Sequence, residues 1–398
     1  MRVLTISHSA VVDASRERER ALRRRGLQVD LLSAKVWDEG GQMVPLVPRP
    51  GEQVVGVRTV GSHPALFLYA PGPLWRAFGR PHDVLDIQQE PFALVTGEIL
   101  VLRTVRRAWD RLLGRRHRRV PYLTSSAQSL DKRYPFPFGA MERAVLRHAD
   151  GMHTCNDDAV AIARRKGATC PVVNIPLGVD LSLFTPGPDD QAPSRPGSVV
   201  GYAGRLVVHK GVDVLIRAVL DDERLTLRIA GAGPQEAELR ALAAPAGDRI
   251  VFLGSLSAPD LVELYREIDV LAVPSLSTEH HAPSRRPAHG VLEQFGRVVV
   301  EAMACGTPVV ASRVGALPDV VGDAGILVEQ RDPAALAAAL HQVLDDPDLA
   351  ATLRQRGFDV VTRYSWDAIA AQVEALYRQV LGHAPDVQPG SPGSSTYG

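Results

Sequence analysis

The chain has 398 residues, of which 45% are hydrophobic and 23% charged, and its formal net charge is zero. This length exceeds one ordinary domain, and the composition is typical of a soluble globular protein with two domains. A neutral chain disfavours a dedicated nucleic-acid binder, because such proteins carry a basic excess. No signal peptide is expected in MRVLTISHSAVV, and no apolar run is long enough to span a bilayer.

The three cysteines, Cys155, Cys170 and Cys305, show no metal-ligand spacing. An odd number without a dense pattern fits a reducing compartment, so we expect a cytoplasmic protein.

In the first half, apolar runs alternate with helical patterns. Residues 2–7 predict a buried strand, residues 14–25 a polar helix that Gly26 ends, and residues 29–32 a second strand. This order predicts a parallel sheet with right-handed crossovers. The Pro-rich and Gly-rich stretch 184–197 is typical of an interdomain linker.

The same alternation restarts after the linker. Strands are predicted at 198–203, 225–230, 250–253, 270–273 and 309–311, and a helix at 212–220. Each half is therefore predicted to be a doubly wound α/β domain, whose ligands bind at the carboxyl ends of the strands. With two such sheets, the space between them is the natural site.

The end of the chain carries one more helical pattern. Ser365 is predicted to cap a helix with an apolar stripe of Ile369, Val373, Leu376 and Val380. The expected organisation is an N-terminal Rossmann-like domain at 1–183, a linker at 184–197, a second Rossmann-like domain at 198–364, a helix at 365–383 that could cross back to the first domain, and a disordered tail at 384–398.

Basic residues and glycines follow the first strand of the second half. Arg205 comes directly after Gly204, and Lys210 stands where the next helix begins. A planar guanidinium fork and a compact ammonium suit a diphosphate. Gly231 ends the following strand in the same manner, and glycine lets the backbone approach a ligand. An ordinary strand-to-helix turn with solvated basic residues is the alternative.

Two acids stand eight positions apart in EQFGRVVVE, namely Glu293 and Glu301. Gly296 precedes a predicted helix at 297–304, whose first free amides favour an anion. Carboxylates would repel a diphosphate, so we expect these acids to accept hydrogen bonds from the hydroxyls on either side of it. A surface glutamate and a loop glutamate are the alternative.

These motifs occur together in a recognisable order. EQFGRVVVEAMACGTPVVAS, preceded by GYAGRLVVHKG and VFLGSLSAPDLVELYREIDVLAVPS, closely resembles the retaining glycosyltransferases of family 4 over about residues 200–365. The resemblance implies an α/β GT-B fold, with two doubly wound Rossmann-like domains facing each other across a deep cleft. It also implies sugar transfer from a nucleoside diphosphate sugar to an acceptor hydroxyl, with no cofactor or metal required.

The resemblance assigns roles to individual residues. It implies that Glu293 contacts the donor sugar, that Glu301 contacts the ribose, and that Arg205 and Lys210 neutralise the leaving diphosphate. The residues that would supply backbone amides are Phe295, Gly296, Arg297 and Val298. Family members commonly have Gly-Gly where this chain has Gly315-Ala316, and the one Asp-x-Asp, Asp346-Pro-Asp348, is predicted to cap a helix.

The resemblance is weaker in the first half. His8 lies in a Ser-His-Ser-Ala loop where many members have Gly-Gly, and it could face the cleft. Ser126 or Gln128 could replace a histidine that many members place near the donor, and Glu90 is a candidate acceptor contact. A loop histidine satisfied within the protein and an exposed loop carboxylate are the alternatives.

Two further segments invite a hypothesis. The stretch from Arg103 to Arg119 mixes arginines with apolar residues and could form an amphipathic surface for anionic lipid, although a solvated basic face is the alternative. The insertion at 277–289 contains three histidines and a glutamate. Its irregular, Pro-rich spacing predicts a mobile loop over the acceptor mouth more than a metal site.

Rival functions remain open from the sequence. A Rossmann oxidoreductase needs Gly-x-Gly-x-x-Gly after the first strand, which this chain lacks. A nucleotide-sugar epimerase, a sugar phosphorylase or a non-catalytic carbohydrate-binding relative would share the fold. The acceptor could be a lipid-linked glycan, a polysaccharide or a small natural product.

Overall fold

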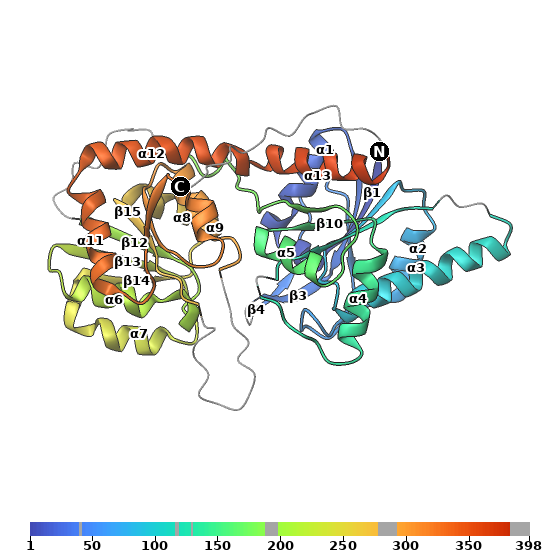
Figure 1. Cartoon of the computed structure of the whole chain (residues 1–398), viewed down its shortest axis with the longest axis horizontal. Coiled ribbons are helices and arrows are strands. Elements are labelled where there is room, and N and C mark those ends of the chain that lie inside the picture. Colours follow the sequence, from blue (N-terminus) through green and yellow to red (C-terminus); the bar gives the residue numbers. More distant parts are fainter. Residues whose placement is uncertain (40–41, 116–118, 129, 188–197, 278–292, 383–398) are drawn as a thin grey trace.

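The structure, a computed structural model, describes residues 1–39, 42–115, 119–128, 130–187, 198–277 and 293–382. Two α/β domains lie side by side, each built on a parallel sheet (Figure 1). Most of the predicted linker, nearly all of the 277–289 insertion and the whole predicted tail lie outside the described residues. Among the described helices, none is both long enough and apolar enough to cross a bilayer.

The N-terminal sheet has the strand order β11-β10-β9-β8-β1-β2-β5, and each pairing is parallel. Its strands are β1 (Arg2–Ile6), β2 (Gln28–Ala34), β5 (Val54–Val57), β8 (Val84–Ile87), β9 (Tyr122–Ser126), β10 (Gly151–Thr154) and β11 (Val172–Asn174). Its helices are α1 (Glu17–Arg24), α2 (Pro71–Phe78), α3 (Leu94–Leu112), α4 (Phe138–His148) and α5 (Asp157–Arg165). The central strands are buried because helices cover both faces of the sheet.

Some features of this half differ from the prediction. The predicted helix at 14–25 begins as a 3₁₀ turn (Asp13–Arg16) before α1, since the buried Arg16 side chain folds back onto the carbonyls of Ala10 and Val11. Two short antiparallel pairs also occur that the sequence did not indicate. They are β3 (Val36–Glu39) with β4 (Gln42–Pro45), and β6 (Thr59–Val60) with β7 (Leu68–Tyr69).

The C-terminal sheet has the order β14-β13-β12-β15-β16-β17, again entirely parallel. Its strands are β12 (Ser198–Ala203), β13 (Leu225–Ala230), β14 (Ile250–Gly254), β15 (Val270–Val273), β16 (Val309–Ser312) and β17 (Gly325–Val328). Its helices are α6 (Val212–Leu220), α7 (Glu236–Ala243), α8 (Ala258–Glu267), α9 (Arg297–Ala304), α10 (Leu317–Val321), α11 (Pro333–Leu344) and α12 (Pro347–Val361). The predicted helices at 212–220 and 297–304 are confirmed, and Asp346 caps α12 by accepting the Leu349 amide at 2.9 Å.

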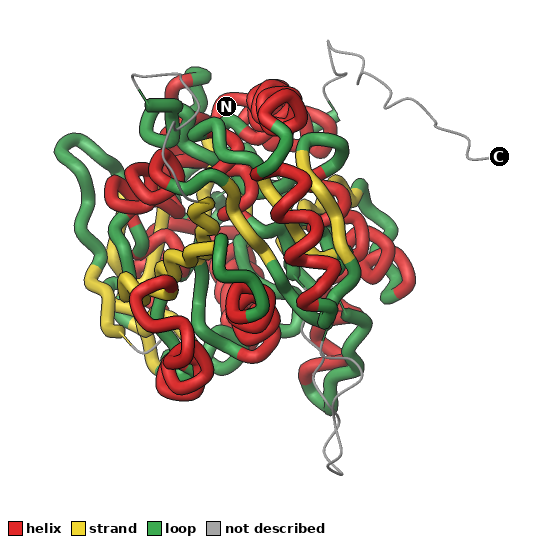
Figure 2. The backbone as a smooth tube through the Cα atoms, turned by 90° about the vertical axis from the view of Figure 1, so that its left-hand side faces the viewer, coloured by secondary structure: helices red, strands yellow, loops and turns green. Residues whose placement is uncertain are grey.

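The last helix, α13 (Trp366–Val380), belongs to the core of the first domain. Ser365 caps it, as predicted, by accepting the Ala368 amide. Its apolar stripe packs with Val3, Val29 and Val84 of the N-terminal sheet. Figure 1 shows α12 and α13 running along one side of both domains, and the end-on view of Figure 2 shows helices surrounding the strands. The end of the chain therefore ties the two domains together.

Candidate functional site

The ends of β12 and β13 meet without intervening side chains. Gly204 donates its amide to the Ala230 carbonyl at 3.0 Å, and Gly231 donates to the Gly254 carbonyl at 2.7 Å. A Cβ on Gly231 would lie 1.8 Å from the Gly204 carbonyl oxygen, and its φ is 138°. Only glycine fits such a position, so the two strand ends can approach each other and a ligand closely.

Lys210 and Glu293 converge at these strand ends. Lys210 ends the 3₁₀ turn η3 (Val208–Lys210), and its Nζ lies 2.5 Å from Glu293 Oε2. Ser275, which follows β15, donates its hydroxyl to the same oxygen at 2.9 Å. The two charged side chains are only 20% and 10% exposed. The carboxylate is therefore held by a cation and a hydroxyl from two different loops, which fixes its direction.

The backbone of Glu293 is fixed as well. Its carbonyl accepts the Ala316 amide at 3.0 Å. Ala316 is the residue at which the expected Gly-Gly pattern is not met. The amide that holds Glu293 is thus supplied by an alanine in this protein.

The first turn of α9 lies next to this pair in the chain. Gly296 is its N-cap, with φ of 81° and ψ of 56°, and no side chain caps the helix. Phe295 is buried and packs edge-on against Tyr364, with ring centroids 5.4 Å apart, which anchors the turn. Arg297 is exposed and Val298 partly buried. Uncapped amides at a helix start favour an anion.

Glu301 lies further along α9 and is buried. The Tyr265 hydroxyl donates to its Oε2 at 3.0 Å. Burial raises the pKa of Glu301, and the charge of Arg297 and the Tyr265 hydrogen bond offset part of that increase. One carboxylate oxygen is thus held by the protein, and the other can accept a hydroxyl hydrogen bond.

Two more basic residues lie around the pair. The Arg205 side chain is exposed, and its carbonyl accepts the Tyr202 hydroxyl at 2.9 Å. His209 is partly buried, and its pKa is lowered first by burial and then by the charges of Lys210 and Arg205. Sequence reasoning missed His209 and Ser275, although both stand beside motif residues.

On the N-terminal side, three predicted residues come together. Glu90, just beyond β8, accepts hydrogen bonds from Ser126 Oγ at 2.7 Å and Gln128 Nε2 at 3.3 Å. The Ala127 amide also donates to Glu90, at 2.8 Å. Burial raises the pKa of Glu90, these three donors lower it in part, and the charge of Glu142 also raises it. The carboxyl is therefore surrounded by neutral hydrogen-bond donors.

The His8 side chain makes its contacts outside the group formed by Glu90, Ser126 and Gln128. Its Nδ1 lies 2.8 Å from Gln89 Oε1, and its ring packs on Trp37 and Phe67, with centroids 4.6 and 5.3 Å away. Burial lowers its pKa, which favours the neutral imidazole. The structure thus places His8 beside an aromatic cluster, one residue away from Glu90 through Gln89.

Gln294 joins the two sides. Its Nε2 donates to the Ala127 carbonyl at 2.7 Å, and its own carbonyl accepts Asn156 Nδ2 at 2.8 Å. No local pattern indicates this link, because it joins residues that lie 138 and 167 positions apart in the chain. The N-cap pattern of Asn156 before two aspartates was the one local signal available.

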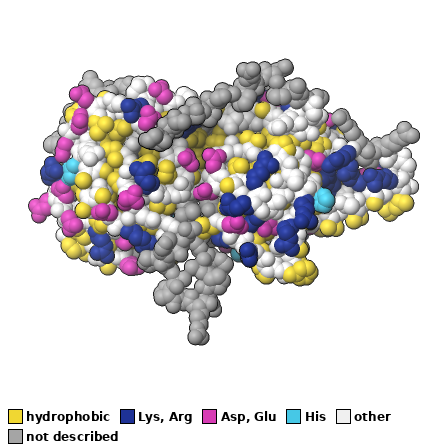
Figure 3. Space-filling model, in the orientation of Figure 1, with side chains coloured by type: hydrophobic (Ala, Val, Ile, Leu, Met, Phe, Trp, Pro, Cys, Tyr) yellow, Lys and Arg dark blue, Asp and Glu magenta, His cyan; other side chains and the backbone are white. Residues whose placement is uncertain are grey.

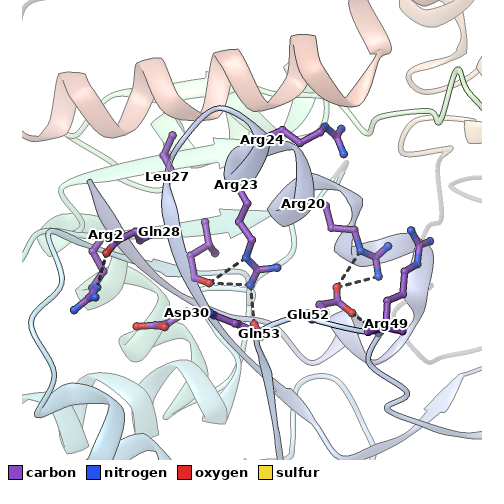
Figure 4. Close-up of a pocket in the computed structure, with 13 residues that line it drawn as sticks. Arg2, Arg20, Arg23, Arg24, Leu27, Gln28, Asp30, Arg49, Glu52 and Gln53 are labelled. Atoms are coloured by element: carbon purple, nitrogen blue, oxygen red, sulfur yellow. Dashed lines mark hydrogen bonds and ion pairs between the residues drawn. The ribbon is translucent and has the colours of Figure 1, made fainter.

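Hollows elsewhere on the N-terminal domain have a different character. One of about 770 Å³, beside the amino ends of β1 and β2, is lined by several arginines (Figure 4). Arg20 pairs with Glu52, and Arg23 donates to the carbonyls of Val29 and Gln53. The hydrogen-bonding capacity of these two arginines is largely used within the protein. Within the described residues, no three His, Cys, Asp or Glu side chains are grouped to hold a metal.

Two parallel-sheet domains joined by a returning C-terminal helix form the GT-B fold. Residues 189–360 match the sequence model of the family described as glycosyl transferases group 1. The C-terminal half of the chain is therefore similar to this family.

Curated relatives agree with this assignment. A D-inositol 3-phosphate glycosyltransferase from Corynebacterium jeikeium is 34% identical, over 65% of this chain and 65% of its own length. Another, from Salinispora arenicola, is 36% identical over 60% of this chain and 57% of its own. The chain therefore matches less than two thirds of the length of these relatives.

Solved structures share the fold. A glycosyltransferase from Rickettsia africae superposes with a TM-score of 0.70, at 14% identity, over 96% of this chain and 99% of that one. Sucrose-phosphate synthase from Thermosynechococcus elongatus gives 0.68 at 23% identity, over 96% and 100%. These likenesses confirm the predicted GT-B architecture.

Proposed function

We propose that this protein transfers a sugar from a nucleoside diphosphate sugar to an acceptor hydroxyl, with retention of configuration and without a metal. The observation that carries the proposal is the Lys210–Glu293 pair at the glycine-lined strand ends, beside the uncapped start of α9. A structural neighbour, HepE from Anabaena, is described in complex with UDP and glucose, which supports this kind of donor.

The charges match the reaction. When the sugar–phosphate bond breaks, positive charge develops at the anomeric carbon and negative charge on the departing diphosphate. Arg205, Lys210 and the first amides of α9 are the groups that would stabilise that negative charge. Such preorganised electrostatic stabilisation is usually the largest catalytic contribution, about 2.7–4 kcal/mol for each donor removed. Glu293, braced by Lys210 and Ser275, would hold a hydroxyl of the sugar.

Proton transfer follows from retention. In the proposed front-face substitution, the acceptor oxygen bonds to the anomeric carbon on the side from which the diphosphate leaves. The acceptor's proton goes to the leaving phosphate, so the products are a glycoside and a nucleoside diphosphate. Neither Glu293 nor Glu301 forms a covalent bond to the sugar. Isolation of a glycosyl-enzyme on either side chain would contradict this mechanism.

The acceptor would approach from the N-terminal domain. Glu90, with Ser126 and Gln128 around it, is the group that could meet an acceptor hydroxyl there. His8, next to Gln89, borders the same region. The three unpaired cysteines are consistent with a cytoplasmic setting.

The outward face of α3 supports a peripheral contact with an anionic lipid surface. Leu112, Val101 and Trp109 are 82%, 61% and 51% exposed. Figure 3 shows hydrophobic side chains along the outer edge of this domain, next to basic ones. On the predicted amphipathic surface, Arg103 is buried and Arg106 pairs with Asp110, whereas Arg111 and Arg115 are exposed beside the apolar residues. A lipid-linked acceptor would suit this arrangement.

Flotation with anionic liposomes tests the lipid contact. We expect the Trp109→Ser/Leu112→Ser variant to float less than the wild type. The matched control is Val60→Ser/Leu66→Ser, two exposed apolar residues of the same domain outside α3. Equal flotation of wild type and the α3 variant would refute the contact.

The donor proposal is tested by thermal-shift and hydrolysis screens against nucleoside diphosphates and their sugars. Glu301→Ala should weaken nucleotide binding, because Glu301 is assigned to the ribose. Glu293→Ala should bind nucleotide normally yet lose transfer, because Glu293 is assigned to the sugar. Normal transfer by both variants would show that the site is wrongly assigned.

A further inference from the structure

Gln294 is held by the N-terminal domain at two atoms, its side-chain amide and its backbone carbonyl, and the carbonyl also accepts a weak hydrogen bond from the Cys155 thiol at 3.9 Å. Its side-chain amide donates to the Ala127 carbonyl at 2.7 Å, and its backbone carbonyl accepts Asn156 Nδ2 at 2.8 Å. Both distances are those of ordinary, well-formed hydrogen bonds. Gln294 stands inside the Glu293–Glu301 motif of the other domain, so the motif itself carries an interdomain contact.

A second hydrogen bond fixes the orientation of the Asn156 side chain. Asn156 is 5% exposed, and its Oδ1 caps α5 by accepting the Ala159 amide at 2.8 Å. With the oxygen used in the cap, the plane of the side-chain amide is set, and Nδ2 points to the Gln294 carbonyl. The Nδ2 donor is therefore already oriented toward the Gln294 carbonyl, which reduces the entropy cost of forming this hydrogen bond.

Ala127, which accepts the hydrogen bond from Gln294, is also bonded to the acceptor-side residue Glu90. The Ala127 amide donates to Glu90, while its carbonyl accepts from Gln294. One residue of the N-terminal domain is therefore bonded to Glu90 on one side and to the C-terminal domain on the other. A displacement of Glu90 or Ala127 would therefore move the hydrogen-bond partner of Gln294.

The link ends at the donor-side pair. Gln294 follows Glu293, whose carbonyl is fixed by Ala316 and whose carboxylate is fixed by Lys210 and Ser275. We propose that Gln294 is a positioning residue that couples the acceptor-side group around Glu90 to Glu293. This proposal rests on the proposed function, because it assumes that Glu293 meets the donor sugar. Geometry shifts of about 1 Å can lower a rate about 100-fold.

The side chain at this position suits the task. An amide supplies the N–H that a carbonyl partner needs, which a carboxylate could not do. It is also uncharged, so it leaves the Lys210–Glu293 ion pair undisturbed. Methionine is close to glutamine in length and volume but cannot donate, so Gln294→Met removes the side-chain bond alone.

Amide hydrogen exchange of the full chain without ligand tests the coupling. We expect Gln294→Met to speed exchange severalfold at residues 293–299 and also at residues 126–128, across the domain boundary. The control is Gln355→Met, an exposed glutamine on α12, which should leave both segments unchanged. Unchanged exchange at both segments in Gln294→Met would overturn the proposal.

The hydrogen bond from Asn156 to the Gln294 carbonyl is tested separately with Asn156→Ser. Serine retains an oxygen that can cap α5, but its side chain is one bond shorter than that of asparagine, so its hydroxyl is withdrawn from the Gln294 carbonyl. We expect faster exchange at residues 293–299 with unchanged exchange within α5. Faster exchange throughout α5 would mean that the variant acts by unfolding its own helix, and the assignment of Asn156 as a residue that holds Gln294 would be wrong.

Kinetics separates positioning from a purely structural role. With the donor identified by the nucleotide-sugar screen, Gln294→Met should lower kcat about tenfold while the Kd for nucleoside diphosphate stays within about twofold, since Lys210, Arg205 and Glu301 are untouched. Unchanged kcat would overturn positioning even where exchange had changed. If the wild type turned over no donor, the proposed function would fail, whereas the exchange measurement would still decide the coupling.

Discussion

Two carboxyl groups in this molecule, Glu293 and Glu90, are held in opposite ways. Glu293 is paired with the Lys210 ammonium at 2.5 Å, beside strand ends braced by glycine. Glu90 is surrounded by a hydroxyl, a backbone amide and a side-chain amide, none of them charged. Under the proposed function, Glu293 lies on the donor side, where fixed charge suits the departing diphosphate, and Glu90 lies on the acceptor side, where neutral hydrogen bonds suit a hydroxyl.

The largest expected effect comes from removing the charge on the donor side. Lys210→Met should lower kcat by about 10²–10³, because a preorganised group that stabilises the leaving diphosphate is lost. Single-turnover transfer with the identified donor measures it. Lys35→Met, the same change at an exposed lysine of the other domain, is the control. A loss of kcat below about threefold would contradict the proposed difference between the Glu293 side and the Glu90 side.

The requirement for glycine at position 231 is tested by measuring the free energy of unfolding. In Gly231→Ala, the new Cβ would meet the Gly204 carbonyl at 1.8 Å, so we expect the free energy of unfolding to fall by more than about 3 kcal/mol. Gly247→Ala is the matched control, with φ of 55° and ψ of −132° and no atom within 4 Å of the new Cβ, and should cost about 1–3 kcal/mol for its backbone conformation alone. Urea denaturation measures both variants. Equal losses would show that the backbone conformation, not the close approach, requires glycine at 231.

The pH dependence of stability probes the acceptor side. Burial raises the pKa of Glu90 in the folded protein, so the folded state binds more protons than the unfolded state just above the ordinary value of 4.5. Stability from this group is therefore present at low pH and declines as the pH rises from 4.5 through the raised pKa.

Glu90→Gln should remove that decline. We expect the difference in unfolding free energy, variant minus wild type, to increase between pH 4.5 and pH 8. Urea denaturation across this range measures it, and Glu223→Gln, at an exposed turn, should give a constant difference. A constant difference for Glu90→Gln as well would show that its neutral surroundings do not disfavour the charged form.

The smallest effect concerns Glu301, which lies on the donor side but is held by a neutral partner. Tyr265→Phe removes the hydroxyl that donates to its carboxylate. We expect a loss of about 1 kcal/mol in stability, because a buried acceptor loses its partner. Nucleotide affinity should fall severalfold, since the carboxylate is less well oriented. Calorimetric titration with nucleoside diphosphate measures this, and unchanged affinity would separate Glu301 from the nucleotide.

The sequence by itself determined what depends on near neighbours. The helix at 297–304 and the Ser365 cap follow from periodicity and capping chemistry within a few residues. The order of strands and helices determined the two parallel sheets. The spacing of Glu293 and Glu301, with Arg205 and Lys210 before them, predicted a donor site, because parallel strands bring successive strand ends to the same edge, and the roles of these residues stay a prediction.

Only the tertiary structure decided what joins distant parts of the chain. It placed Ser275 on Glu293, Gln294 on Ala127 and Asn156, and α13 in the core of the first domain. It also turned the apolar stripe of α3 outward and Arg103 inward. The physical reason is that hydrogen bonds and packing between segments far apart leave no local pattern, since each partner is an ordinary residue until folding brings it to the other.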